Sequence, residues 1–344
     1  MTARAADVAV VGGGIVGLAA ADALAQRGAA VVVLERGEPG AGQSAGAARG
    51  FRHLHATEAQ IADAVAARAG WDAWSERAGE PLVGEEGALR LGGDVAADAA
   101  RLRACGVPAE VVEQAGDRHP ALLPGAGPLL WDPRGGAIRA ERAIAWLRDG
   151  LDVRRTAATA VAPGRVETDG GALVCGAVVV CAGAGTERLW PHVELRRTIH
   201  LRVTFAAPEA PADAARASWG AATWADRTGD FGARTYGVAD GPGRFALGLA
   251  ELDAQPVPAD PLAAEVGTAP DLAGVRARLH DYARAAFPGL GEPIGEVVRL
   301  LTVLPGDDED AYVLHREPGL AVLAGHNLFK LAPLLGERLA RAIL

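Results

Sequence analysis

Residues 7–35, DVAVVGGGIVGLAAADALAQRGAAVVVLE, decide the fold of this chain. The β-branched run at the start predicts a buried strand, and the alanine-rich stretch behind the glycines predicts a helix to about Arg27. Gly28 is placed to end that helix, and residues 31–34 predict a second buried strand. Strand, glycine turn, helix and strand within about thirty residues form a βαβ unit with a parallel pair of strands.

The turn between the first strand and the helix has the spacing G-x-G-x-x-G. Its glycines are Gly12, Gly14 and Gly17, and Ile15 and Val16 fill the last two variable positions. The first glycine permits a tight turn, the second lets the backbone approach a pyrophosphate, and the third lets the helix pack on the strand. The N-terminus of the helix adds free N–H groups and a partial positive charge for the phosphates.

An acidic residue completes this unit. Glu35 closes the second strand, 18 residues after Gly17, where a carboxylate can accept both ribose hydroxyls of an adenosine. Arg36 follows directly and is a further candidate cofactor contact. Together these features predict the binding of an adenine dinucleotide.

The composition is that of a folded protein with a sizeable core. Of the 344 residues, 50% are hydrophobic and 22% are charged, and the formal net charge of −9 disfavours nucleic acid as a partner. Cys105, Cys175 and Cys181 are too irregularly spaced for a disulfide framework, and no histidine or cysteine pattern indicates a metal site. Without a signal peptide or membrane-spanning stretch, the sequence predicts a soluble, reduced, cytoplasmic protein.

The use of lysine and asparagine is unusual. Lys330 is the single lysine among 34 basic residues, and Asn327 is the single asparagine. A drift towards GC-rich codons explains the other arginines, but it does not explain why these two residues persist three positions apart near the C-terminus.

The remaining patterns predict an α/β protein with a second sheet. Helices are expected at 57–78, 139–149 and 271–286 and from Pro333, and strands at 87–91, 151–168, 177–181, 196–250 and 320–323. The first helix has candidate buried positions at Ile61, Val65, Ala69, Trp71 and Trp74. We expect a discontinuous Rossmann-type domain (1–80, 138–195 and 300–344) and a mainly antiparallel substrate domain (81–137 and 196–299).

The segment SAGAARGFRH at 44–53 distinguishes FAD from NAD. Small residues at Ser44 and Gly46 let a planar group lie against the backbone, and Arg49 and Arg52 can point the same way if the segment is helical. This arrangement resembles the D-amino acid oxidase superfamily, most closely its branch of sarcosine oxidases and glycine oxidases.

Two later segments carry the same resemblance. VVVCAGAG at 178–185 matches a second flavin-contacting strand and turn, with Ala182 and Gly183 as candidate contacts. AGHNLFKLAP at 324–333 matches the C-terminal flavin motif, whose candidate contacts are Gly325, His326, Asn327, Phe329 and Lys330. The resemblance implies FAD as the cofactor and a fold like that of D-amino acid oxidase and p-hydroxybenzoate hydroxylase.

The resemblance also implies roles for three cations. Arg52 and Lys330 are expected to hold the substrate's carboxylate, and Arg49 is expected beside the flavin ring, where positive charge favours the reduced, anionic form. The implied reaction oxidises the C–N bond of an amino or imino acid by hydride transfer to flavin N5, with oxygen or another electron acceptor. For His53, packing and a catalytic role both remain open.

Three departures from the family pattern limit this reading. No cysteine lies near Arg299, where the sarcosine-oxidase relatives attach the flavin, so we expect noncovalent FAD. Ala246 stands where an oxygen-activating lysine is expected, which leaves oxidase and dehydrogenase both open. The C-terminal motif is about two residues short, which leaves the substrate open, including an intermediate of a small-molecule biosynthetic pathway. Its candidate lining residues are Trp219, Trp224, Phe231 and Tyr236.

Other classes remain as alternatives. A flavin monooxygenase shares the N-terminal turn and the acidic residue but not the segment at 326–330. An NAD dehydrogenase would need a second nicotinamide site, for which the middle of the chain shows no pattern. A flavin-binding subunit of a larger complex is the non-enzymatic alternative. The oligomeric state, monomer or homo-oligomer, is not indicated.

Overall fold

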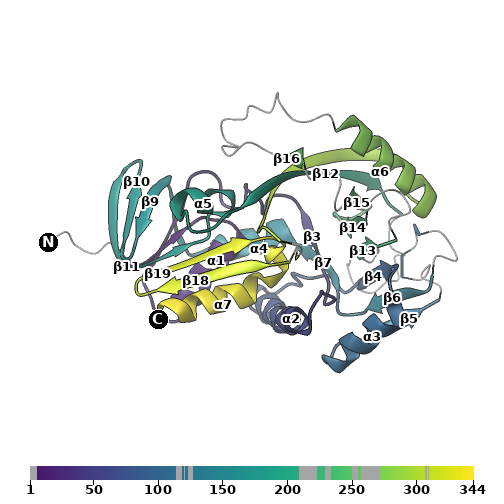
Figure 1. Cartoon of the computed structure of the whole chain (residues 1–344), viewed down its shortest axis with the longest axis horizontal. Coiled ribbons are helices and arrows are strands. Elements are labelled where there is room, and N and C mark those ends of the chain that lie inside the picture. The colour runs from purple at the N-terminus through teal and green to yellow at the C-terminus, as the bar shows by residue number, and fades with distance from the viewer. Residues whose placement is uncertain are drawn as a thin grey trace.

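The computed structural model describes residues 6–113, 118–119, 121–122, 127–208, 223–228, 234–249, 255–256, 272–306, 308 and 310–344. Within this part of the chain, two large sheets and one small sheet are covered by helices (Figure 1). None of the described helices is both long enough and apolar enough to cross a membrane.

The first large sheet contains the predicted βαβ unit. Its order is β18-β19-β11-β1-β2-β8; the strands from β19 to β8 run parallel, and β10 and β9 extend β11 as antiparallel neighbours. The strands are β1 (Ala6–Val11), β2 (Val31–Glu35), β8 (Asp152–Arg155), β9 (Ala158–Ala162), β10 (Arg165–Thr168), β11 (Gly171–Val180), β18 (Tyr312–Glu317) and β19 (Leu320–Gly325).

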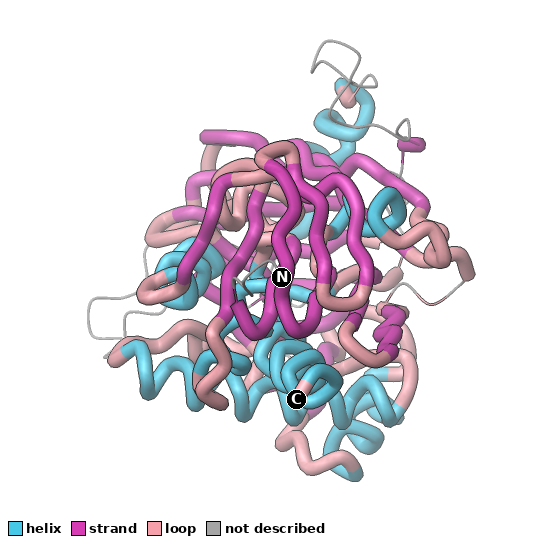
Figure 2. Tube along the Cα trace, turned by 90° about the vertical axis from the view of Figure 1, so that its left-hand side faces the viewer, coloured by secondary structure: helices cyan, strands magenta, loops and turns pink. Residues whose placement is uncertain are grey.

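Helices from both ends of the chain share one core beside this sheet. They are α1 (Ile15–Ala25), α2 (Glu58–Ala78), α4 (Ala140–Arg148) and α7 (Ala332–Ile343). Gly336 of α7 lies so close to α1 that an added Cβ would be 2.7 Å from the backbone of Ala19. Figure 2 shows helices grouped beneath the strands, with the C-terminus among them. The C-terminal motif is thereby held against the start of α1.

The second large sheet is mainly antiparallel, as predicted. Its order is β16-β12-β15-β14-β13-β4-β6-β5, and β17 pairs with β12. The strands are β4 (Ala88–Leu91), β5 (Glu110–Val112), β6 (Leu129–Asp132), β12 (Arg196–Ala206), β13 (Thr223–Asp226), β14 (Thr235–Ala239), β15 (Arg244–Leu249), β16 (Gln255–Pro256) and β17 (Pro293–Val303). The helix α6 (Ala273–Ala286) packs on β12 and β15, and α3 (Val95–Ala104) packs on β6 (Figure 1).

Short elements connect the two large sheets. They are the antiparallel pair β3 (Ala48–Phe51) and β7 (Gly136–Arg139), the helix α5 (Thr186–Leu189), and the 3₁₀ turns η1 (Gly183–Gly185) and η3 (Leu328–Leu331). The expected domain boundary at residue 300 falls inside β17, so the division into domains stays a prediction.

Two local expectations were wrong. Arg49 lies in strand β3 and Arg52 directly follows it, so the two side chains do not share a helical face. In α2, Ala69 is exposed and Val65 only half-buried, whereas Ala64 and Ala67 are buried. The buried stripe is set by the two tryptophans, Trp71 and Trp74, and continues through positions three or four residues apart. Of the candidate lining residues, Trp219 and Phe231 lie outside the described residues.

Candidate functional site

The glycine turn between β1 and α1 has the geometry that its spacing predicts. Gly12 has φ +109° and lies against the carbonyl of Cys181, and an added Cβ on Gly17 would collide with the carbonyl of Gly12. Gly14 begins α1 without a side-chain cap. The turn therefore requires glycine, and the positive end of α1 lacks a cap from its own first residue.

Glu35 and Ser44 both contact this turn. The carboxylate of Glu35 accepts the backbone N–H groups of Gly13 and Gly37 over 2.7 and 2.9 Å. Each carboxylate oxygen has a second lone pair that can accept a ribose hydroxyl. Ser44 Oγ accepts the N–H of Ile15 at 3.1 Å, at the first turn of α1. Arg36, in contrast, is exposed.

Gln43 brings together the segments expected to contact the flavin. Its amide contacts the hydroxyl of Thr302 over 3.0 Å, and that hydroxyl lies 3.4 Å from the carbonyl of Gly325. The side chain of Gln43 also lies near Gly183, 3.6 Å from the position of an added Cβ. The small-residue loop, the second turn and the C-terminal motif thus meet at one place, although they lie far apart in the sequence.

Three guanidinium groups form what we call the arginine cluster: Arg49, Arg202 of β12 and Arg299 of β17. Arg49 and Arg299 both donate to the carbonyl of Ala45, over 2.6 and 2.8 Å. Arg49 and Arg202 both donate to the carbonyl of Ala48, over 2.8 and 3.2 Å. Two backbone carbonyls therefore hold three like charges side by side.

The arginine cluster carries an excess of positive charge. Burial, and then the charge of Arg202, lowers the pKa of Arg299 to about 10. Burial and both neighbouring arginines lower the pKa of Arg49 well below its ordinary value. Asp240 lies 3.4 Å from Arg202, and the Nε atoms of Arg202 and Arg299 are buried without a hydrogen-bond partner among the described residues. The cluster can therefore stabilise negative charge that develops nearby.

A second group, the carboxylate clamp, consists of Arg52, His55, Asn327 and Lys330 around the side chain of Asp310. Lys330 Nζ and Asn327 Nδ2 donate to Oδ1 of Asp310 over 3.1 and 2.8 Å. His55 Nδ1 donates to Oδ2 at 2.7 Å, and Nη2 of Arg52 lies 3.6 Å from the same oxygen. The two expected substrate-binding cations, Arg52 and Lys330, do converge, and they converge on a carboxylate of the protein itself.

The electrostatics of the clamp follow from its burial. Burial lowers the pKa of Lys330 to about 8, with a further contribution from the charge of Arg52. Burial and the charge of Lys330 lower the pKa of His55 to about 3, so its ring is neutral. Burial alone would raise the pKa of Asp310, but Lys330, His55 and Arg52 hold it well below its ordinary range.

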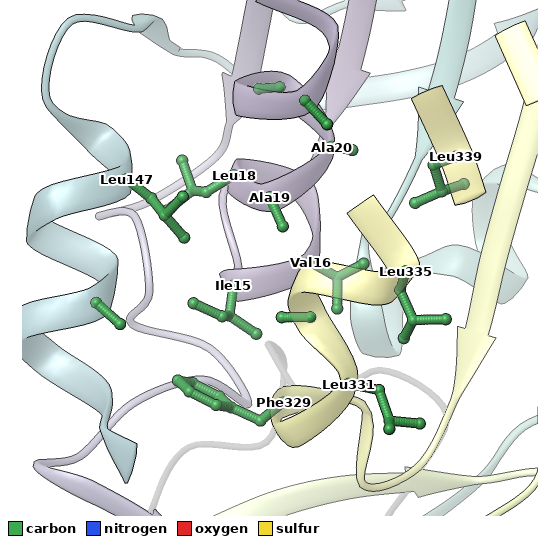
Figure 3. Packing of buried hydrophobic residues seen from close by; sticks show 14 of the residues in the cluster. Ile15, Val16, Leu18, Ala19, Ala20, Leu147, Phe329, Leu331, Leu335 and Leu339 are labelled. Atoms are coloured by element: carbon green, nitrogen blue, oxygen red, sulfur yellow. The ribbon is translucent and has the colours of Figure 1, made fainter. Parts of the chain in front are cut away.

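The C-terminal motif is fixed by aromatic packing. Phe329 stacks on Trp71 of α2 with ring centroids 6.3 Å apart, and Trp71 Nε1 donates to the carbonyl of Lys330 at 2.7 Å. The guanidinium of Arg49 lies 5.1 Å from the centre of the Phe329 ring. Figure 3 shows Phe329 and Leu331 beside Ile15 and Val16 of α1. Lys330 is thus positioned by its neighbours on both sides.

Three of the other residues named in the sequence analysis are buried outside the two groups of cations. His53 is buried against Asp132, with Nδ1 2.9 Å from a carboxylate oxygen, which supports packing rather than catalysis. Trp224 donates to the hydroxyl of Tyr282 at 2.6 Å inside the core of the second sheet, and Ala246 is fully buried there. The sequence did not single out His55, Asp310, Arg202 or Gln43, because none of them belongs to a motif with a recognisable spacing.

The chain was compared with known families, curated proteins and solved structures. A family model described as DAO, FAD dependent oxidoreductase, matches residues 7–342. Among curated proteins, no sequence matches significantly.

Three solved structures illustrate the likeness of fold. NikD, described as an unusual amino acid oxidase essential for nikkomycin biosynthesis, is 24% identical with a TM-score of 0.83, over 99% of this chain and 94% of that chain. Glycine oxidase from Geobacillus kaustophilus is 22% identical, with a TM-score of 0.78 over 98% and 95%. L-proline dehydrogenase from P. horikoshii is 19% identical, with a TM-score of 0.80 over 98% and 93%.

Proposed function

Because the chain belongs to the DAO family of FAD-dependent oxidoreductases, we propose that it oxidises the C–N bond of an amino or imino acid. The observation that supports this substrate class most directly is the convergence of Arg52 and Lys330 on one carboxylate group. Two cations that reach one side-chain carboxylate can hold the α-carboxylate of a substrate in the same way. The NikD, glycine oxidase and proline dehydrogenase likenesses agree with this class.

The residues around the glycine turn fit FAD. The start of α1, whose N-cap residue Gly14 has no side chain, and the tight glycine turn suit a pyrophosphate. The remaining lone pairs of Glu35 suit ribose hydroxyls. Gly46, Gly183 and Gly325 are the proposed contacts around the ring, next to the arginine cluster. When bound, FAD supplies the two-electron acceptor for the reaction.

The chemistry that we propose for the substrate is a two-electron oxidation. The amine binds unprotonated, and its nitrogen lone pair forms the C=N bond as the hydrogen on Cα departs with its electron pair. The imine then hydrolyses to an oxo acid or aldehyde and an amine, or cyclises. Arg52 and Lys330 orient Cα by holding the carboxylate, and the arginine cluster provides fixed positive charge where negative charge develops.

We propose that FAD is bound noncovalently. The strand position that matches the attachment cysteine of the related oxidases is Arg299 or a neighbour, and no cysteine lies nearby in the sequence. Cys181 lies next to the glycine turn, but burial raises the pKa of its thiol to about 12, which makes it a poor nucleophile. Acid precipitation is expected to release all yellow colour into the supernatant. Colour that stays with the precipitate would contradict noncovalent binding.

Whether oxygen or another molecule accepts the electrons of the reduced flavin needs a separate measurement. Ala246 is fully buried and carries no charge that could activate oxygen, while Arg49 and Lys330 remain candidate sources of such a charge. Stopped-flow mixing of the reduced protein with air-saturated buffer distinguishes the two cases. A fast second-order reoxidation identifies an oxidase, and a slow one identifies a dehydrogenase.

The proposed function is tested by bleaching of the bound flavin under nitrogen. A panel of free, N-substituted and cyclic amino acids is added to the isolated chain, and the loss of the absorbance near 450 nm is followed. We expect bleaching by at least one carboxylate-bearing member but not by its amide or by the corresponding simple amine. Bleaching only by simple amines would contradict the proposal, and bleaching of the isolated chain would exclude a purely structural flavin-binding role.

A further inference from the structure

Asp310 is the residue of the site that the proposed function does not explain. It sits directly before β18, and its carboxylate faces donors from three separate parts of the chain, at 52–55, 327 and 330. One imidazole, one amide and one ammonium donate hydrogen bonds to it, and the guanidinium of Arg52 lies 3.6 Å away. Such a set of donors is a complete recognition site for a carboxylate.

Asp310 is a poor candidate for a general base. The donors around it hold its pKa well below the ordinary range of a carboxyl group. A carboxylate with such a low pKa is a weak base and would take a proton from a substrate inefficiently. His55 cannot replace it, because its Nδ1 donates to Asp310 and its pKa is lowered to about 3. The chemistry of the pair is therefore recognition of a negative charge, not proton transfer.

A substrate carboxylate and Asp310 cannot both be bound by the same donors. Two carboxylates placed between Arg52 and Lys330 would repel each other, so a substrate carboxylate and Asp310 compete for the same positive charge. We propose that Asp310 is an internal competitor for the substrate's carboxylate, and that it thereby sets the affinity and the selectivity of the site. This inference rests on the proposed function, since it takes Arg52 and Lys330 as the substrate's anchor.

Asn327 has a defined part in this arrangement. It is the one described non-glycine residue with positive φ, at +54°, and its exposed side chain donates to Asp310. The single asparagine and the single lysine of the chain, at 327 and 330, thus contact the same carboxylate oxygen. Asn327 and His55 hold Asp310 in the clamp without offering a positive charge to the substrate.

The test is the exchange Asp310→Asn, which keeps the shape of the side chain and removes its charge. The purified FAD-bound protein is titrated with pyrrole-2-carboxylate, and the change in flavin absorbance gives the Kd. When an internal group occupies a site, the apparent Kd of an external ligand equals its intrinsic Kd divided by the fraction of molecules whose site is free. Removal of the internal carboxylate should therefore lower the Kd by at least about tenfold. Pyrrole-2-carboxamide, which lacks the charge, should show no such gain.

The control is Asp63→Asn. Asp63 also forms a partly buried ion pair, in its case with Arg338, and its carboxylate accepts a hydrogen bond from the hydroxyl of Tyr312. No contact of Asp63 with Arg52 or Lys330 is seen among the described residues. Its exchange is expected to leave the Kd for the carboxylate unchanged. An equal gain in both variants, or no gain in Asp310→Asn, would overturn the proposal and would make Asp310 a residue that only positions the two cations.

A second variant covers the case in which Asp310→Asn does not fold or does not retain FAD. Asn327→Gly deletes one donor to Asp310 and keeps the positive φ, which glycine adopts freely. It is expected to lower the Kd for pyrrole-2-carboxylate by about two- to threefold, in the same direction as Asp310→Asn; an unchanged or raised Kd contradicts the proposal. If no amino or imino acid bleaches the flavin while the Kd still falls, the proposed function fails and the role of Asp310 stands.

Discussion

The two groups of cations in the site are held in opposite ways. In the arginine cluster, the guanidinium groups of Arg49, Arg202 and Arg299 all donate to backbone carbonyls, and Arg202 also faces a carboxylate, that of Asp240. In the carboxylate clamp, Arg52 and Lys330 face the side chain of Asp310. A backbone carbonyl cannot be exchanged for a ligand, whereas a side-chain carboxylate can. The contrast indicates that the cluster supplies fixed positive charge and the clamp supplies an exchangeable site for an anion.

The two groups also differ in how they respond to pH. An arginine stays protonated throughout the usual range, even where burial lowers its pKa. Lys330 is different, because burial brings its pKa to about 8. The charge of the arginine cluster is therefore constant across neutral pH, while the charge of the clamp changes there. Each of the following predictions separates one group from the other.

The largest effect is expected for Arg52→Met. It removes the one guanidinium of the clamp, and the loss of a charge-assisted hydrogen bond to a carboxylate should lower kred/Kd for an amino acid substrate by about a hundredfold. The FAD content should not change. Anaerobic stopped-flow reduction measures the effect, and Arg68→Met is the control, since Arg68 pairs with Asp72 outside the clamp. An equal loss of kred/Kd in both variants would show that the clamp has no special part in binding the substrate.

A smaller effect of another kind is expected for Arg299→Met, which takes one charge out of the arginine cluster. The flavin's reduction potential should fall and its reduction should slow by about tenfold, because less positive charge faces the developing negative charge. The Kd for pyrrole-2-carboxylate should stay the same. Potentiometric titration and the binding titration measure the two quantities.

Arg276→Met is the control for this variant, because Arg276 pairs with Glu296 on the same sheet away from the cluster. A change in carboxylate Kd for Arg299→Met without a change in potential would reverse the assignment, and would place the substrate's anchor in the cluster.

The sequence was sufficient for the parts of the fold that depend on local patterns. Residues 7–35 specify strand, turn, helix and strand by short-range periodicity, and the structure confirms each of them. The presence of a second, separate sheet also follows from local patterns, because alternating strands and helices at both ends of the chain enclose a middle region of strands. Arg49 and Arg52 show the limit, since their spacing suits a helix and the segment forms a strand paired with β7.

Asp310 shows why the clamp could not be predicted in full. It ends the run Asp307-Asp308-Glu309-Asp310, and a run of acidic residues reads as a solvated turn. The inward position of Asp310 depends on His55, which lies 255 positions away in the sequence. The arginine cluster is similar, because the face on which Arg202 and Arg299 point depends on the register between β12 and β17.

A moderate effect is expected for Lys330→Arg, which keeps the charge of the clamp and changes its shape. The guanidinium is larger and more rigid than the ammonium, and it would crowd a carboxylate already held by Arg52. Reduction of the flavin by substrate should slow by about fivefold to tenfold, while the Kd for FAD should change by less than about twofold. Stopped-flow reduction and fluorescence titration of the apoprotein measure the two quantities. Unchanged reduction kinetics would argue against contact between Lys330 and the substrate.

The smallest effect is a pH dependence confined to the clamp. As the pH rises through about 8, Lys330 loses its proton, and only Arg52 still offers a positive charge to a carboxylate. Asp310 remains ionised and His55 neutral over that range, because both have a pKa far below it. The Kd for pyrrole-2-carboxylate, which has no amine to titrate, should therefore rise by about threefold to fivefold between pH 7 and pH 9.5.

Lys330→Arg is the matched variant for this dependence, since a guanidinium has a higher intrinsic pKa than the ammonium that it replaces. Its Kd should be weaker at pH 7 but constant up to pH 9.5. A rise of equal size in both proteins would locate the titrating group elsewhere, whereas a flat profile in the wild type would mean that Lys330 stays charged in spite of its burial. The Arg299→Met variant should keep the pH dependence of the wild type, because it leaves Lys330, Arg52 and Asp310 of the clamp unchanged.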